Sequence, residues 1–368
     1  KPIKMRVFLL RGDRDTIMSP LDSIKYYNKF LRIGMVSMDP RNGDVKAWVG
    51  GINYKHFKYD QVYQGKRQPG STFKPFVYCS AIDGNYVTPC DPIVDRQVCI
   101  GDWCPKNSTG SYSGQALTLR QALAKSVNSI SVHLMKMVRP KKVVEYAHKL
   151  GITSPIPEEV TICLGTPNVS VFEMVNAYST FANNGKHVEP RFVTRIEDKN
   201  GRVLADFPIQ EKEVISPSVA YQMLFIMRGA VEDPWGTAQR LRTQYKLADN
   251  NDIAAKTGTT SDYTDGWFMG MTPNLVTGVW VGGEDNHVHF TTMALGQGAR
   301  IAMPAWGLYM QKVYGDIDLA GSEKSPYRRE RFFKPDGMEA NIGCSGIKLD
   351  SLNTYLRPKV TDDESILF

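Results

Sequence analysis

A serine and a lysine three residues apart, Ser71 and Lys74, follow a Pro69-Gly70 pair that favours a turn. If a helix begins there, residues i and i+3 share one face, so the hydroxyl and the ammonium could lie within hydrogen-bond reach. A serine hydroxyl is a weak nucleophile until a base takes its proton, and a desolvated lysine can be that base. The helix N-terminus would present unpaired N–H groups to whatever Ser71 attacks. The pair therefore indicates acyl transfer, although this spacing also arises by chance in many chains.

Two further polar residues, Ser126 and Asn128, fall at a break between helices that we expect over 117–124 and 129–138. Short polar side chains at such a break can face a cleft. Each could equally be an ordinary helix cap, because serine and asparagine are favoured there. They join the same site only if the fold brings them to Ser71.

The stretch from Lys256 to Thr260 lies at the end of an expected strand over 253–257. Lys256 and the threonines after it can hold a carboxylate through charge-assisted hydrogen bonds. Gly258 has no side chain and would let another backbone approach closely. Thr257, by contrast, is more simply a strand residue with no ligand contact.

The order of apolar runs and turns predicts the elements that must position these residues. An early hairpin is expected from runs over 33–38 and 45–49, which flank a turn-rich stretch. The expected helix that carries Ser71 runs from 71 to about 82, and helical patterns dominate the middle of the chain. Later elements are expected over 253–257, 267–271, 276–281 and 303–313. One antiparallel sheet of about five strands can join the early and late runs, with helices on both faces and a mostly helical subdomain, which is an α+β fold.

Composition narrows the possible partners. The 45 Lys and Arg residues exceed the 38 Asp and Glu residues by seven, which suits an anionic substrate but, without a dense basic run, does not indicate nucleic-acid binding. No stretch approaches the roughly 20 apolar residues of a membrane-spanning helix. The six cysteines contain no C-x-x-C pair and the six histidines no metal-binding spacing, so we expect no metal and no cofactor. Cys99 and Cys104 bracket a short loop and could form a disulfide in an oxidising compartment, a point that the sequence leaves open.

The three stretches together resemble a known signature. S-x-x-K, S-x-N and K-T-G in this order are typical of penicillin-binding proteins and serine β-lactamases. The residues around Ser71, from Arg67 to Phe76, are most similar to class A, the bifunctional penicillin-binding proteins, as are the hairpin over 39–51 and the stretch over 256–268. The resemblance runs from about Phe30 to Tyr314 and covers the transpeptidase domain of that class.

This resemblance implies a D,D-transpeptidase and a role for each matched residue. Ser71 would attack the carbonyl between the two D-alanines of a peptidoglycan stem peptide, and Lys74 would take its proton. Ser126 would relay a proton to the leaving amine. Asn128 would orient Lys74 and hold an amide of the substrate.

The K-T-G stretch would bind the other end of the substrate. Lys256 and Thr259 would hold its terminal carboxylate, with Gly258 and Thr260 in the same substrate-binding stretch. The backbone N–H groups of Ser71 and Thr259 would form the oxyanion hole.

The resemblance also implies a setting. The chain opens at Lys1 without a methionine, so we expect a piece of a longer protein. Residues 1–29 would be the remnant of an interdomain linker, 30–318 the transpeptidase domain and 319–368 a C-terminal tail. The full-length protein would also use a lipid-linked glycan precursor and be anchored on the periplasmic side of the bacterial inner membrane. β-Lactam antibiotics would acylate Ser71 as substrate mimics.

Other functions share these motifs. A D,D-carboxypeptidase would use every one of these residues, and a β-lactamase would need in addition a base that activates water. Glu158, Glu159 and Glu173 lie between the second and third motifs, but in no glutamate motif of the class A β-lactamases. A β-lactam sensor would carry signalling segments, and a non-catalytic cell-wall scaffold would usually have lost one of the three motifs.

Overall fold

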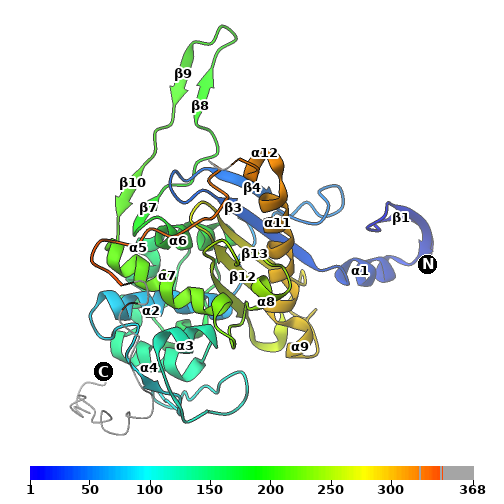
Figure 1. The fold of residues 1–368 in the computed structure, drawn as a ribbon. Helices are drawn as coiled ribbons and strands as arrows, with labels where there is room; N and C mark the ends of the chain where they lie inside the picture. Colours follow the sequence, from blue (N-terminus) through cyan, green and yellow to red (C-terminus); the bar gives the residue numbers. More distant parts are fainter. Residues whose placement is uncertain (323–324, 340–341, 343–368) are drawn as a thin grey trace.

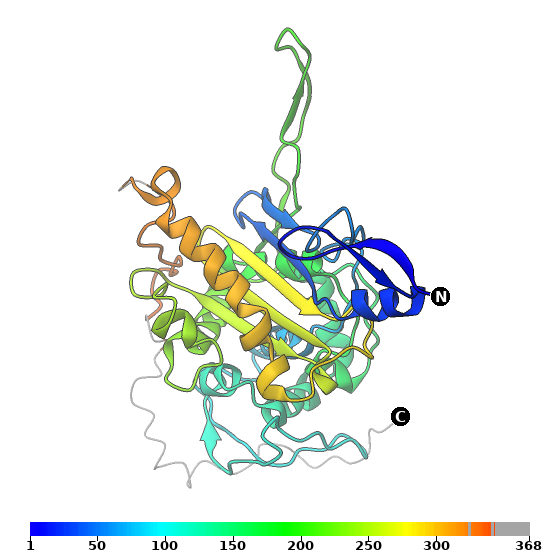
Figure 2. The ribbon, with the colours of Figure 1, turned by 90° about the vertical axis from the view of Figure 1, so that its right-hand side faces the viewer.

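A five-stranded antiparallel sheet, in the order β11-β12-β13-β3-β4, organises the computed structural model, which describes residues 1–322, 325–339 and 342 (Figures 1 and 2). Strand β13 pairs with β3, so that Val276 lies opposite Met38 and the late strands join the early hairpin. The strands are β3 (Arg32–Met38), β4 (Val45–Val49), β11 (Ala254–Thr259), β12 (Asp265–Met271) and β13 (Val276–Gly282). The predicted α+β fold, with its sheet of about five strands, is confirmed.

Both faces of the sheet are covered, because every residue of β12 and β13 is buried. Side chains alternate along a strand. Met269 therefore packs on one side with α6 (Val171–Ala182), whereas Phe268 contacts Trp306 of α11 (Met303–Gly315) on the other. Figure 2 shows α11 lying across that second face. The two cores hold the late strands rigidly, and β11 carries Lys256 at the edge of this sheet.

A helical subdomain adjoins the sheet and surrounds α2 (Lys74–Asp83), whose residues are buried up to Ile82 (Figure 1). Its other helices are α3 (Leu119–Ala124), α4 (Asn128–Val138), α5 (Pro140–Leu150) and α7 (Pro217–Glu232). Helix α7 packs against both α3 and β11. The predicted helical middle is thus observed, and it brings the turn before Asn128 close to the end of β11.

The predicted helix over 71–82 is wrong at its start. Ser71 lies in a 3-10 turn, η1 (Gly70–Phe73), and the α-helix begins only at Lys74. The reason is Pro75, which has no N–H to donate and fits an α-helix only within its first turn. The nucleophile candidate therefore sits on a tight turn ahead of α2.

The remaining elements lie at the periphery. The N-terminal part forms a hairpin of β1 (Ile3–Val7) and β2 (Arg14–Met18), followed by α1 (Pro20–Asn28), which the side chain of Ser19 caps. A long hairpin of β8 (Arg195–Glu197) and β9 (Val203–Asp206) projects from the body in both views (Figures 1 and 2). The other elements of the described residues are short: β5 (Ile93–Val94), β6 (Ala116–Leu117), η2 (Val160–Leu164), β7 (Lys186–Val188), β10 (Glu211–Glu213), α8 (Arg240–Thr243), η3 (Ser261–Tyr263), α9 (Met293–Gly296), α10 (Gly298–Ile301) and α12 (Ile317–Ala320).

Part of the predicted C-terminal tail packs on the domain. Glu330 is buried, and its carboxylate accepts hydrogen bonds from Tyr314 Oη at 2.6 Å and Asn274 Nδ2 at 2.7 Å. Residues 343–368 of that prediction lie outside the described residues. Across the described ranges, no helix is both long enough and apolar enough to cross a membrane.

Candidate active site

Ser71 lines a cavity of about 460 Å³ where three segments meet: η1, the turn between α3 and α4, and the end of β11. The cavity wall includes Ser126, Asn128 and Thr259. The fold thus brings the three predicted motifs together, although they are separated by long stretches of chain. Ser71 Oγ itself has no hydrogen-bond partner among the described residues, so the expected contact with Lys74 is not made in this state.

Lys74 is completely buried behind the cavity. Its Nζ donates hydrogen bonds to Ser126 O at 2.7 Å and Asn128 Oδ1 at 2.6 Å, and it lies 3.5 Å from Ser126 Oγ. Burial disfavours the ammonium and lowers the pKa of Lys74 to about 7. The side chain is therefore neutral for part of the time near neutral pH, as a general base must be.

Ser126 occupies a backbone conformation that usually belongs to glycine, with φ at +59°. Helix α3 ends in a Schellman motif: Val127 N–H donates to Ala122 O at 2.9 Å and Ser126 N–H to Leu123 O at 3.0 Å. The left-handed position of this motif normally takes glycine because a side chain is strained there. A serine at this position costs folding energy, and its Oγ reaches the lysines.

Lys256 is completely buried on β11 and approaches Ser126 from the side of the sheet. Its Nζ donates to Ser126 Oγ at 2.9 Å and to Thr257 O at 2.8 Å. Burial first, and then the charge of Lys74, lower the pKa of Lys256 well below its ordinary value. Ser126 therefore lies between two buried amines, and it is energetically costly for both amines to be charged at once.

Asn128, the first residue of α4, is held by a loop that the sequence did not single out. Asn128 Nδ2 donates to Lys106 O at 2.9 Å, and the N–H of Asn128 donates to Asn107 Oδ1 at 2.9 Å. Asn107 Nδ2 and Ser129 Oγ donate in turn to the buried carboxylate of Asp95, at 2.8 and 2.6 Å. Burial alone would raise the pKa of Asp95, but these hydrogen bonds lower it overall. A loop outside the three motifs thus positions a motif residue.

Gly258 allows the sheet edge to press against the turn that carries Ser71. A Cβ added there would lie 2.5 Å from Pro69 O and 2.9 Å from Thr72 Cγ2. Gly70, with φ at +53°, faces the same strand, since its Cβ would lie 2.7 Å from Thr259 O. These two glycines permit the close approach of β11 and η1, and this contact places the backbone of Thr259 beside Ser71.

The three threonines of the K-T-G stretch are not equivalent. Thr259 Oγ1 accepts a hydrogen bond from Gly298 N–H at 3.0 Å, so its own proton can still be donated to a ligand. Thr260 Oγ1 is engaged with Thr264 Oγ1 at 2.7 Å and with a carboxylate oxygen of Asp265 at 3.2 Å. Thr257 Oγ1 donates to Thr237 Oγ1 at 2.9 Å. Thr259 is therefore the better placed of the three to bind a carboxylate.

Several other residues of the cavity wall carry no sequence signal. They come from loops and helix ends and include Trp103, Lys106, Lys125, Thr166 and Thr237. Their positions depend on tertiary packing. Nowhere in the described ranges do three or more His, Cys, Asp or Glu side chains gather as a metal site would require.

The chain is similar to penicillin-binding proteins over most of its length. The family model described as the penicillin-binding protein transpeptidase domain matches residues 33–287, and the penicillin-binding protein middle domain model matches residues 1–31. The chain is 35% identical to penicillin-binding protein 1A of Neisseria meningitidis serogroup B over 76% of its own length and 36% of that protein. It is also 35% identical to penicillin-binding protein 1A of Aquifex aeolicus, over 77% of its own length and 38% of that protein. The chain therefore spans less than half of these curated relatives.

Solved structures agree with these matches. Penicillin-binding protein 1A of Haemophilus influenzae superimposes with a TM-score of 0.71 at 27% identity, covering 78% of this chain and 48% of that one. The PonA1 protein of Mycobacterium tuberculosis in complex with penicillin V gives a TM-score of 0.70 at 27% identity, covering 86% of this chain and 85% of that one.

Proposed function

The chain belongs to the penicillin-binding protein transpeptidase family, and we propose that it is a serine-type D,D-transpeptidase that cross-links peptidoglycan stem peptides. The predicted resemblance to class A is confirmed by the matches to penicillin-binding protein 1A. The observation that carries the proposal is that Ser126, which lines the same cavity as Ser71, accepts hydrogen bonds from the two buried lysines, Lys74 and Lys256. This arrangement supplies a base, a proton relay and a second amine close to the Ser71 hydroxyl.

Acylation begins when neutral Lys74 takes the proton of Ser71 Oγ as Oγ attacks the carbonyl carbon between two D-alanines. The carbonyl oxygen gains negative charge, which the N–H groups of Ser71 and Thr259 stabilise. Lys256 and the Thr259 hydroxyl hold the terminal carboxylate. The pKa of Lys74, about 7, supports its role as the base.

The tetrahedral intermediate then breaks its C–N bond. The proton held on Lys74 passes through Ser126 Oγ to the leaving nitrogen, so D-alanine departs as a neutral amine. The acyl group remains on Ser71 as an ester. In the second half-reaction an amine of another stem peptide attacks this ester. A new amide forms, the amine proton returns to Ser71 Oγ, and the enzyme is regenerated.

The residues of the cavity wall favour transfer of the acyl group to an amine over hydrolysis of a β-lactam. None of its lining residues is Asp or Glu. Glu158 and Glu159 are exposed outside it, and the carboxylate of Glu173 is buried among hydrogen bonds from Lys66, Ser154 and Ser170. A carboxylate that could activate water on the ester is therefore missing from the described wall.

The setting of the whole protein follows from the same resemblance. We propose that residues 1–29 precede the transpeptidase domain as part of a region between domains. We further propose that the full-length protein is anchored on the periplasmic side of the inner membrane, where it meets the lipid-linked glycan precursor and β-lactams.

Intact-mass analysis after treatment with benzylpenicillin tests the proposal. We expect one covalent adduct on the wild-type chain and none on Ser71→Ala. An adduct that survives Ser71→Ala would refute the assignment of the nucleophile. Product analysis with a stem-peptide donor and an amine acceptor then separates cross-linking from D,D-carboxypeptidase hydrolysis.

A further inference from the structure

The wall of the cavity beside Ser71 contains two lysines, Lys106 and Lys125, and no acidic side chain. Most of its other polar side chains are hydroxyls and amides. A cleft lined by charge of one sign concentrates ligands of the opposite sign. In the proposed function, Lys256 and Thr259 bind the terminal carboxylate of the donor. Lys106 and Lys125 are therefore available for a second negative charge on the ligand.

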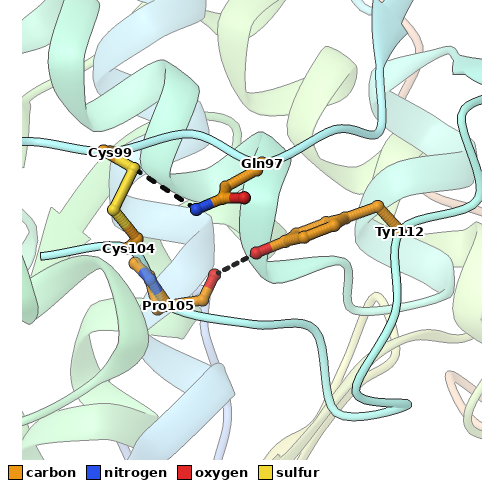
Figure 3. Close-up of a disulfide and its surroundings, with 5 residues drawn as sticks. All are labelled: Gln97, Cys99, Cys104, Pro105 and Tyr112. Carbon is orange, nitrogen blue, oxygen red and sulfur yellow. Dashed lines mark hydrogen bonds between the residues drawn. A yellow bond between two sulfur atoms is a disulfide. The ribbon is translucent and has the colours of Figure 1, made fainter.

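Lys106 belongs to a loop whose backbone is fixed. The Cys99–Cys104 disulfide closes the loop just before it, and Tyr112 Oη donates to Pro105 O at 3.3 Å (Figure 3). On its other side, Lys106 O accepts the hydrogen bond from Asn128 Nδ2 at 2.9 Å. The loop thus holds Lys106 directly beside a motif residue.

Lys125 lies at the end of α3, directly before Ser126. Its Nζ lies 5.1 Å from the centre of the Trp235 ring, a cation–π distance that holds the side chain without neutralising it. Neither Lys106 nor Lys125 forms an ion pair with any residue that the structure describes. By contrast, Lys66 and Arg120 are paired with carboxylates.

We propose that Lys106 and Lys125 form a second anion subsite, which binds a carboxylate on the acyl side of the scissile bond. This inference rests on the proposed function and specifies its substrate: an acyl donor with at least one carboxylate in addition to its terminal one. The terminal carboxylate binds at the end of β11. The second carboxylate binds at the wall formed by the Lys106 loop and the end of α3.

A matched pair of β-lactams tests the subsite. Carbenicillin differs from benzylpenicillin by one carboxylate on the acyl side chain. Second-order acylation rate constants are measured for the wild type, Lys106→Gln, Lys125→Gln and the double variant. Lys141→Gln, an exposed position on α5, is the control with the same change of net charge. The measured quantity is the ratio of the carbenicillin constant to the benzylpenicillin constant.

Each exposed charge pair is weak, so we expect the ratio to fall about threefold in each single variant and about tenfold in the double variant. It should be unchanged in Lys141→Gln, and raising the salt concentration should reduce the difference between wild type and double variant. An unchanged ratio in the double variant, or an equal fall in Lys141→Gln, would overturn the subsite while leaving benzylpenicillin acylation intact. If benzylpenicillin does not acylate the wild type at all, the proposed function fails first. Thermal melts of each variant confirm that it is folded.

Discussion

Lys256 Nζ donates a hydrogen bond to Ser126 Oγ over 2.9 Å, across 130 residues of sequence. Since the hydroxyl accepts this bond, its own proton can be donated toward the cavity, where the leaving amine of a donor peptide would lie. The bond also ties the edge strand β11 to the end of α3. One hydroxyl therefore joins the two walls of the site and provides a path for a proton between them.

The strained backbone of Ser126 gives a test that separates chemistry from stability. Ser126→Gly and Ser126→Ala both remove Oγ, so we expect acylation by benzylpenicillin to slow about 10²–10³-fold in each. Glycine accepts φ at +59° without strain and alanine does not, so Ser126→Gly should be more stable than Ser126→Ala by about 1 kcal/mol. Stopped-flow acylation and urea unfolding give the two quantities. Wild-type acylation by Ser126→Gly would exclude the relay.

The pKa of Lys74 predicts how acylation depends on pH. The reacting form is the neutral amine, and burial lowers the pKa of Lys74 to about 7. We therefore expect the second-order acylation rate constant to fall about tenfold per pH unit well below pH 7 and to level off above it. Lys74→Arg keeps a cation that does not deprotonate, so it should lose acylation throughout this range. A constant rate between pH 5 and 8 would mean that another group is the base.

The sequence predicted the fold well because its main elements have local signals. The hairpin of β3 and β4 is marked by turn residues between apolar runs. The start of α2 was predicted too early. The residues before Pro75 have a helical pattern, but Pro75 fits an α-helix only within its first turn. The packing of Glu330 against Tyr314 could not be predicted, because a single buried carboxylate in a polar segment has no periodicity.

The sequence predicted which residues form the site, but not the hydrogen bonds that position them. The sequence placed Ser71, Ser126 and Lys256 in one reaction. In the structure Ser71 and Ser126 line one cavity, and the buried Lys256 is hydrogen-bonded to Ser126. It gave no reason to connect Asp95 with Asn128, since that contact runs through a side-chain network between loops. The Cys99–Cys104 disulfide, which the sequence left open, is present.

Glu173, near the start of α6, should contribute strongly to the stability of the domain in acid. Burial alone would raise its pKa, but hydrogen bonds from Lys66, Ser170 and Ser154 outweigh burial and lower the pKa to about 2 from 4.5. Because the folded-state pKa lies below the unfolded one, the carboxylate contributes about 3 kcal/mol that is present above pH 4.5 and lost as pH falls toward 2. Glu173→Gln should therefore lower the unfolding free energy at pH 7 and flatten its pH dependence between 5 and 3. Urea unfolding across this range measures both, and an unchanged slope would contradict the assignment.

A side chain at Gly258 should be costly because β11 and η1 approach closely there, more than because the residue lies in a strand. Gly258→Ala forces a Cβ within 2.5 Å of Pro69 O, so β11 and η1 must separate. We expect a loss of about 1–3 kcal/mol in stability and a fall in acylation of at least tenfold, because Thr259 moves away from Ser71. Gly315→Ala, where nothing lies within 4 Å of the added Cβ, is the control and should change neither quantity. Acylation by Gly258→Ala at the wild-type rate would show that this contact does not position the site.

The Asp95 network predicts a change in the pH profile of acylation. Asn107→Ala removes the acceptor that holds the N–H of Asn128, and Asp95→Ala removes the group that holds Asn107. Asn128 Oδ1 accepts a hydrogen bond from Lys74 Nζ at 2.6 Å, a contact that favours the charged lysine and so raises its pKa. Loosening Asn128 should therefore shift the midpoint of the acylation profile to lower pH, besides slowing acylation about tenfold.

The double variant distinguishes positioning from a general loss of stability. If Asp95 acts through Asn107, the effects of the two substitutions on the acylation rate should be far from additive, with the double variant close to the weaker-reacting single one. Ser113→Ala, which removes a different hydrogen bond to Asp95, should lower stability with a smaller shift of the midpoint. Additive effects with an unmoved midpoint would show that Asp95 only stabilises its loop. A downward shift shared by Asp95→Ala and Asn107→Ala would instead show that a buried carboxylate outside the three motifs tunes the base through Asn128.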